Sequence, residues 1–98
     1  MLDPVIHQEA RLRIVALLHR NGEASFKRLG DELSLTPGNL GAHVSKLEEA
    51  AYVRERQALT AAGFERRFLL TSAGAEAFRA YLARLQEILA DATRMDAA

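Results

Sequence analysis

The side chains best suited to contacting a binding partner are concentrated in residues 36–53. Leu40, Val44 and Leu47 recur at four and three residues, the spacing of a buried helical stripe. At about 100° per residue, the opposite face carries short, hydrogen-bonding or weakly basic residues. They are Gly38, Ala42, Ser45, Lys46 and Glu49, with Asn39 and His43 on the shoulder of the face. Our hypothesis is that this segment is a helix that reads DNA.

Signals before this helix predict the element that would position it. Thr36 is a suitable N-cap, and Pro37 follows at the first helical position, where an N–H is not needed. Ser25 can cap a preceding helix that runs to about Leu33, in which Gly30 indicates the close approach of another helix. Only Ser34 and Leu35 connect the two helices. So short a connection predicts a helix-turn-helix, with the second helix as the reader.

The other elements follow from changes in periodicity. A scaffold helix is predicted from Asp3-Pro4 to Asn21-Gly22. Proline is favoured in the first turn of a helix, and glycine is favoured just after its last turn. Residues 52–56 and 66–70 are β-compatible runs that predict a hairpin of unsettled register, with a long loop around residues 61–63. Thr71 can cap a last helix that runs to about Arg94, and residues 95–98 are expected to fray. The predicted fold class is mainly α with a small β-hairpin (α+β).

The last predicted helix has more apolar surface than a small domain needs for its own core. One use of this surplus is coiled-coil-like pairing with a second copy of the chain, and the other is folding back over the first helix. We favour pairing. The residues assigned to this dimer surface are Phe78, Tyr81, Leu82, Leu85, Ile88 and Leu89.

Composition narrows the class of protein. The chain has 98 residues, enough for one domain, and it has no cysteine, which excludes disulfides and thiolate chemistry. Its three histidines lie far apart, and it has no phosphate-binding glycine loop and no nucleophile with a nearby base. We therefore expect no metal site, no cofactor and no enzymatic activity. No apolar run is long enough to cross a membrane, so a cytoplasmic location is expected.

Net charge neither supports nor excludes DNA as a partner. Thirteen basic side chains are balanced by thirteen acidic ones. Many nucleic-acid-binding proteins instead carry an excess of lysine and arginine.

Four segments in order resemble the small winged helix-turn-helix transcriptional regulators of the MarR/ArsR-like group. They are residues 7–14, 35–40, 43–48 and, at the junction of hairpin and last helix, 70–74. The resemblance implies a winged helix-turn-helix DNA-binding domain over residues 1–72 and a C-terminal dimerisation helix over 73–98, within one compact domain. It further implies a sequence-specific homodimer, with residues of about 36–50 in the major groove and a wing of about 52–71 on the DNA backbone.

The resemblance also implies which residues face DNA. An asparagine can pair with an adenine edge, an alanine can meet a thymine methyl group, and lysine or serine can contact guanine or phosphate. The four arginines of the wing either contact phosphate or form only a charged sheet face. The implied set is Thr36, Asn39, Ala42, His43, Ser45, Lys46, Arg54, Arg56, Arg66 and Arg67.

The chain departs from this family pattern at three places. Gly41 stands where a hydroxyl side chain is usual, and Ala51 stands where glycine is usual. If residue 51 is left-handed, alanine there costs about 1 kcal/mol. Residues 58–64 contain no arginine, so we expect weak contacts from the wing. The alternative is a winged-helix module for protein–protein contact with weak or no DNA binding. The sequence identifies no operator, regulated gene, sign of regulation or small-molecule effector.

Overall fold

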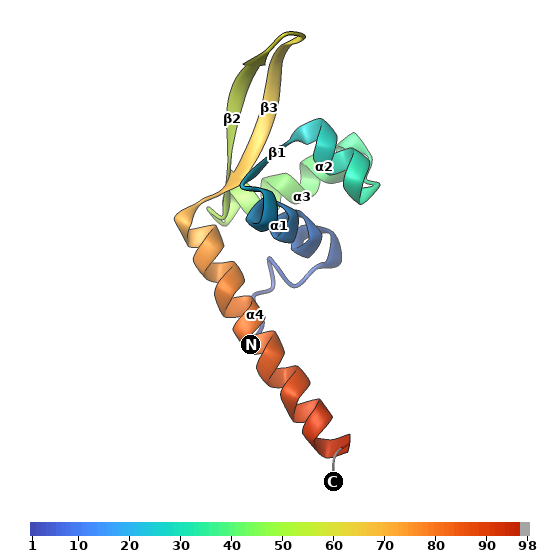
Figure 1. The fold of residues 1–98 in the computed structure, drawn as a ribbon, viewed down its shortest axis with the longest axis vertical. Coiled ribbons are helices and arrows are strands. Elements are labelled where there is room, and N and C mark those ends of the chain that lie inside the picture. The colour runs from blue at the N-terminus through green and yellow to red at the C-terminus, as the bar shows by residue number, and fades with distance from the viewer. Residues whose placement is uncertain (97–98) are drawn as a thin grey trace.

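Three short helices pack together, while a hairpin and a long helix project from them (Figure 1). The structure, a computed structural model, describes residues 1–96 and the side chains of residues 1–94. The elements in order are α1 (Glu9–Asn21), β1 (Glu23–Ser25), α2 (Phe26–Leu33), α3 (Pro37–Glu49), β2 (Val53–Thr60), β3 (Gly63–Leu70) and α4 (Ser72–Asp96). This arrangement confirms the predicted α+β winged helix. The expected fraying of residues 95–98 falls partly outside the described residues.

The start of the first helix differs from the prediction. Asp3 caps a separate turn, in which its Oδ1 accepts a hydrogen bond of 2.8 Å from the Val5 N–H. Helix α1 begins only at Glu9, because Gln8 is extended and its side chain caps the helix by accepting from the Arg11 N–H. Ile6, between the two caps, is fully buried. The Asp3-Pro4 signal therefore marks a turn that closes one end of the core.

The helix-turn-helix forms at the predicted caps. Ser25 Oγ accepts from the Arg28 N–H, and Thr36 Oγ1 accepts from the Asn39 N–H. A Cβ on Gly30 would lie 3.3 Å from the carbonyl oxygen of Leu35, so the tight turn returns close to α2 at this glycine. This contact explains why a residue with poor helix propensity occupies the middle of α2.

The sheet has three antiparallel strands in the order β1-β3-β2, and β1 was not predicted. Three residues are too few to show a periodicity, and β1 exists because it pairs with β3 along Glu23↔Leu69 to Ser25↔Arg67. The predicted long loop of the hairpin is wrong. Pairing of β2 with β3 continues to Thr60↔Gly63, which leaves a two-residue turn. Thr60 Oγ1 supports this turn by accepting from the Ala62 N–H and donating to the Gly63 carbonyl.

Helix α3 ends in a left-handed residue that is not glycine. Ala51 has a φ of 63°. Its N–H donates to the Glu48 carbonyl, and the N–H of Tyr52 donates to the Leu47 carbonyl, the pair of bonds that closes many helices. Residue 51 is therefore left-handed, and this chain has alanine where the resembling regulators usually have glycine. Alanine costs about 1–2 kcal/mol here relative to an unstrained residue.

The core limits the surface that α4 can offer to a partner. Phe78 and Tyr81 are 4% and 3% exposed and pack in the chain's own core, where the ring of Phe78 contacts that of His19 edge-on. Two residues assigned to the dimer surface are therefore covered within the chain. The remaining candidate pairing surface is Leu82, Leu85, Ile88 and Leu89. No helix among residues 1–96 is long and apolar enough to span a membrane.

Candidate nucleic-acid interface

Helix α3 divides into one buried and one exposed face, as its periodicity predicts. Leu40, Val44 and Leu47 are buried in the core. The exposed positions place an amide, a methyl group, a hydroxyl and an ammonium group along the outside of one helix, with the capping hydroxyl of Thr36 at its start. These residues are Thr36, Asn39, Ala42, Ser45 and Lys46. The structure therefore brings five of the six candidate residues from this segment onto an accessible surface.

The sixth, His43, is tied to α1. Its Nδ1 lies 3.3 Å from Nη1 of Arg11, and the Nε of Arg11 donates to the Val5 carbonyl. In this geometry a neutral imidazole nitrogen accepts from the guanidinium. His43 is half-buried at the edge of the exposed face, so it has less freedom than its neighbours to contact a partner.

Three of the four wing arginines are occupied by carboxylates. Both Nε and Nη2 of Arg56 donate to Glu23, at 3.0 and 2.6 Å. Arg67 lies between Glu23 and Glu65, at 2.9 and 2.8 Å. The hydrogen-bonded guanidinium of Arg56 holds the pKa of Glu23 below its usual range, although partial burial opposes this. The charges of Arg56 and Arg67 are thus neutralised within the protein.

Arg66 lies on the opposite face of the hairpin and is held from two sides. It forms two hydrogen bonds with Glu55, at 2.8 and 3.2 Å, and these lower the pKa of that carboxyl. Its guanidinium also stacks 4.6 Å from the ring centre of Phe26. A guanidinium that stacks on a ring and pairs with a carboxylate has two favourable contacts to lose before it can bind phosphate.

Arg54 is the exception among the wing arginines. It is exposed on β2, and it makes no ion pair with any side chain in residues 1–94. Lys46, on α3, is likewise exposed and forms no ion pair within this part of the chain. These two cations are therefore available to an anionic partner without breaking an existing pair. The pairing of Arg56 could not be predicted because its partner Glu23 lies in β1, a strand without a local sequence signal, and the pairing of Arg66 with Glu55 depends on a strand register that the sequence did not settle.

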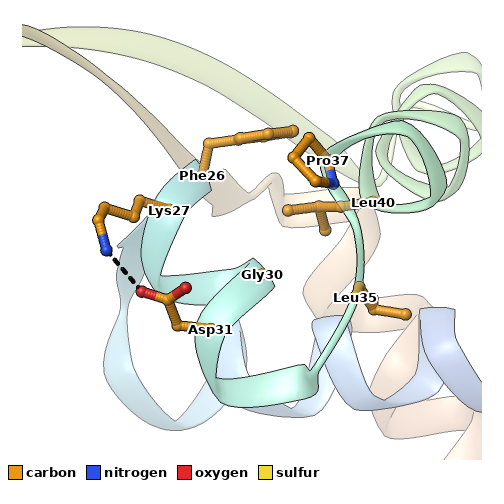
Figure 2. A pocket seen from close by; sticks show the side chains of 7 residues that line it. All are labelled: Phe26, Lys27, Gly30, Asp31, Leu35, Pro37 and Leu40. Atoms are coloured by element: carbon orange, nitrogen blue, oxygen red, sulfur yellow. Dashed lines mark hydrogen bonds and ion pairs between the residues drawn. The ribbon is translucent and has the colours of Figure 1, made fainter.

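A small apolar groove lies beside the start of α3 (Figure 2). Its volume is about 240 Å³, and Phe26, Leu35, Pro37 and Leu40 line it with Gly30 at its base. An ion pair of 2.8 Å between Lys27 and Asp31 stands at its rim. Typical small-molecule sites enclose about 300–1,000 Å³. The groove is smaller than these sites.

Comparison with known proteins places this arrangement in a family. The sequence profile of the winged helix DNA-binding domain matches residues 10–89. An uncharacterized protein of Methanocaldococcus jannaschii is 29% identical over 84 residues, which cover 86% of this chain and 91% of that protein.

Solved structures agree with the profile. A transcriptional regulator homologue from Pyrococcus horikoshii OT3 superposes with a TM-score of 0.83 at 25% identity, covering 89% of this chain and 86% of that one. A structure assigned to the MarR family of transcriptional regulators, from Enterococcus faecalis V583, has a TM-score of 0.82. At 15% identity, and with 96% of this chain and 84% of that chain covered, it supports the fold alone. The chain belongs to the winged helix DNA-binding domain family, and the resemblance to winged-helix transcriptional regulators is confirmed.

Proposed function

We propose that this protein is a sequence-specific transcriptional regulator that binds double-stranded DNA as a homodimer. Helix α3 of each subunit enters the major groove, and the wing formed by β2 and β3 lies on the adjoining backbone. The observation that carries the proposal is the exposed face of α3, where Asn39, Ala42, Ser45 and Lys46 form a row of hydrogen-bonding and methyl groups free of bulky side chains. A helix that served only as scaffold would have no need for this combination.

The proposed contacts differ in their roles. Asn39 and Ala42 read base edges, an adenine and a thymine methyl group respectively. Lys46 and Ser45 contact guanine or phosphate, and Thr36 lies near a phosphate at the helix N-terminus. His43 contributes from the edge of the face. Among the wing arginines, Arg54 can contact phosphate without breaking an ion pair. The other three, Arg56, Arg66 and Arg67, would have to break their ion pairs with glutamates.

Replacement of Lys46 by alanine tests the role of α3. Binding of the wild-type protein to a random-sequence duplex should weaken steeply as salt rises, because each phosphate contact releases counterions. In Lys46→Ala the slope of log affinity against log salt should fall by about 0.9 per lost phosphate contact. Fluorescence anisotropy at several salt concentrations measures this slope. The matched control is Arg84→Ala, which removes one positive charge from α4 and should leave the slope unchanged. Equal slopes for Lys46→Ala and wild type would show that Lys46 contacts no phosphate.

A second candidate function is protein–protein contact without DNA binding. The observation that favours it is the neutralisation of three wing arginines by glutamates of the same chain. The same titration separates the two candidates. Failure of the wild-type protein to bind duplex at low salt would exclude the regulator and leave the interaction module.

Glu23 is proposed to restrain DNA binding, and its removal should increase affinity. Glu23→Gln eliminates the carboxylate that holds Arg56 and one of the two that hold Arg67, which keeps its pair with Glu65. We expect duplex affinity at low salt to rise about threefold to tenfold and the salt slope to steepen by about 0.9 for each arginine that reaches phosphate. Stability should change little, since exposed ion pairs contribute little to it.

The control for Glu23→Gln is Glu87→Gln, which breaks the exposed pair with Arg84 on α4 and removes the same charge. If both variants raise affinity equally, the effect reflects net charge rather than release of the wing arginines. An unchanged affinity in Glu23→Gln would show that Arg56, the arginine held by Glu23 alone, does not face DNA.

A further inference from the structure

The tip of the wing carries two large apolar side chains that remain about three-quarters exposed among the described residues. Leu59 on β2 and Phe64 on β3 are 76% and 75% exposed. They are direct partners in the hairpin register, so their side chains stand next to each other on one face. A leucine and a phenylalanine thus stand side by side at the end of a projecting ribbon. Their apolar area is not buried when the chain folds, so it contributes nothing to the stability of the fold.

This pair continues a row of side chains that begins in the core. Along β3, Phe64, Arg66 and Phe68 share one face, because side chains of a strand alternate. Phe68 is fully buried, and Arg66 lies over the rings of Phe26 and Phe68. The end of the hairpin projects from the packed helices (Figure 1). Phe64 lines a shallow surface hollow with Phe26 and Lys27 of α2, but it remains 75% exposed, so the helices do not cover the apolar tip.

The surroundings of the pair select the chemistry of its partner. Residues 57–64 contain no charged side chain, and the nearest wing arginine, Arg66, is held by Glu55. Lys27 of α2, which lines a surface hollow with Phe64, is paired with Asp31. The tip is therefore not built to hold phosphate by charge. Two side chains on a two-stranded ribbon also supply far less area than the roughly 800 Å² that each partner buries in a stable protein–protein interface.

The minor groove of DNA matches a feature of this size and chemistry. Proteins that kink DNA insert one or two apolar side chains between base steps from the minor groove. Strand β2 starts at Val53, shortly after α3 ends at Glu49, and the hairpin projects from the packed helices (Figure 1). With α3 in the major groove, the tip of this hairpin would reach toward the adjoining backbone and groove.

We infer that Leu59 and Phe64 form an apolar wedge that enters the minor groove beside the segment read by α3. This inference rests on the proposed function and deepens it. Its consequence is specificity without base hydrogen bonds: flexible pyrimidine–purine steps are preferred at the position of the wedge, because they unstack most easily.

Selection of bound sequences from a random duplex pool tests the wedge. The variants are Leu59→Ser with Phe64→Ser, and the control Ala62→Ser in the turn of the same hairpin. We expect all the proteins to enrich the same segment read by α3, whereas only wild type and the control also enrich a pyrimidine–purine step at a fixed distance from it. On the duplex selected by wild type, the double variant should bind about tenfold more weakly, since burial of one large apolar side chain contributes at least that factor.

A tryptophan at the tip provides a second readout. The chain has two tyrosines but no tryptophan, so Phe64→Trp introduces a single indole whose emission can be excited selectively. Its emission should be quenched when the selected duplex is added, because the ring stacks against bases. The emission of Ala90→Trp, a control on α4, should not change.

Several results would overturn the wedge. The double variant would do so if it selected the same sequences as wild type with the same affinity. It would also do so if it lost the segment read by α3, or if sedimentation showed a changed oligomeric state for it. For Phe64→Trp, the contradicting result is an emission that does not change on duplex binding. Failure of the wild-type protein to bind any duplex at low salt would instead refute the proposed function itself. Wild-type binding that weakens in Lys46→Ala but is insensitive to the tip variants would refute the wedge alone.

Discussion

Gly74→Ala should destabilise the protein more than any other exchange of glycine for alanine in the chain. A Cβ built on Gly74 would lie 2.0 Å from the carbonyl oxygen of Tyr52 and 2.8 Å from its carbonyl carbon. Both atoms belong to backbone, so no side-chain rotation relieves the overlap. The start of α4 would have to move away from the start of β2.

That movement would break the contacts that join the two segments. The Thr71 N–H donates to the Tyr52 carbonyl at 3.0 Å, and Thr71 Oγ1 donates to the Ala51 carbonyl at 2.6 Å. Thr71 Oγ1 also caps α4 by accepting from the Gly74 N–H. Overpacking a rigid site costs about 1–3 kcal/mol and occasionally more, and the loss of these bonds adds to it. We expect a decrease of about 3 kcal/mol or more in the free energy of unfolding.

Thermal unfolding followed by circular dichroism, at one fixed protein concentration, measures this effect. A loss of about 3 kcal/mol lowers the melting temperature of a domain of this size by roughly 15 °C. The matched control is Gly41→Ala within α3, where a Cβ would meet nothing within 4 Å. It should be neutral or stabilising by up to about 1 kcal/mol, because alanine is the better helix former. Similar melting temperatures for Gly74→Ala and Gly41→Ala would refute the close approach of α4 to β2.

The features of this fold that could be predicted from sequence are those determined by neighbouring residues. Ser25, Thr36 and Thr71 each cap the helix that follows, and each acts through a backbone N–H only three residues ahead. The division of α3 into a buried and an exposed face follows from local periodicity in the same way. The candidate residues from this helix could therefore be named from the sequence, apart from the inward tie of His43 to Arg11.

What could not be predicted depends on contacts between distant segments. Strand β1 has no local signal and forms by pairing with residues more than forty positions away. Because β1 was not predicted, its residue Glu23 was not expected to lie beside β3 and pair with Arg56 and Arg67. Gly74 could be quoted as part of a family-like segment, but only the backbone of Tyr52 shows why a side chain does not fit there. The exposure of Leu59 and Phe64 depends on the tight turn, which the sequence pattern did not indicate.

Disruption of the exposed apolar stripe of α4 should convert the protein to a monomer and greatly weaken DNA binding. The first half of α4 is anchored by Phe78 and Tyr81, but all residues from 86 to 94 are exposed. Figure 1 shows this half of the helix extending well beyond the other elements. Ile88 and Leu89 are exposed large apolar residues of this half, and Leu82 is another in the first half of the helix. An isolated helical segment of this length is marginal in water, so a second copy of the helix is the proposed support.

The test is the double substitution Ile88→Glu with Leu89→Glu, which places two negative charges in the proposed dimer interface. Sedimentation analysis should show a dimer for wild type and a monomer for the variant. Since a dimer gains avidity from two linked half-sites, the monomer should bind the selected duplex about a hundredfold more weakly. Far-ultraviolet circular dichroism should also report fraying of the second half of α4 while the melting of the winged-helix core persists.

The control for this prediction is Ala90→Glu, which lies on the face of α4 away from the stripe and should remain dimeric. A wild-type protein that sediments as a monomer would refute the dimer directly. A double variant that remains dimeric and keeps wild-type affinity would show that the copies pair elsewhere. Loss of DNA affinity in a variant that is still dimeric would place α4 near the DNA instead of between the subunits. Only the joint loss of the dimer and of affinity links the long helix to the reading of two half-sites by two copies of α3.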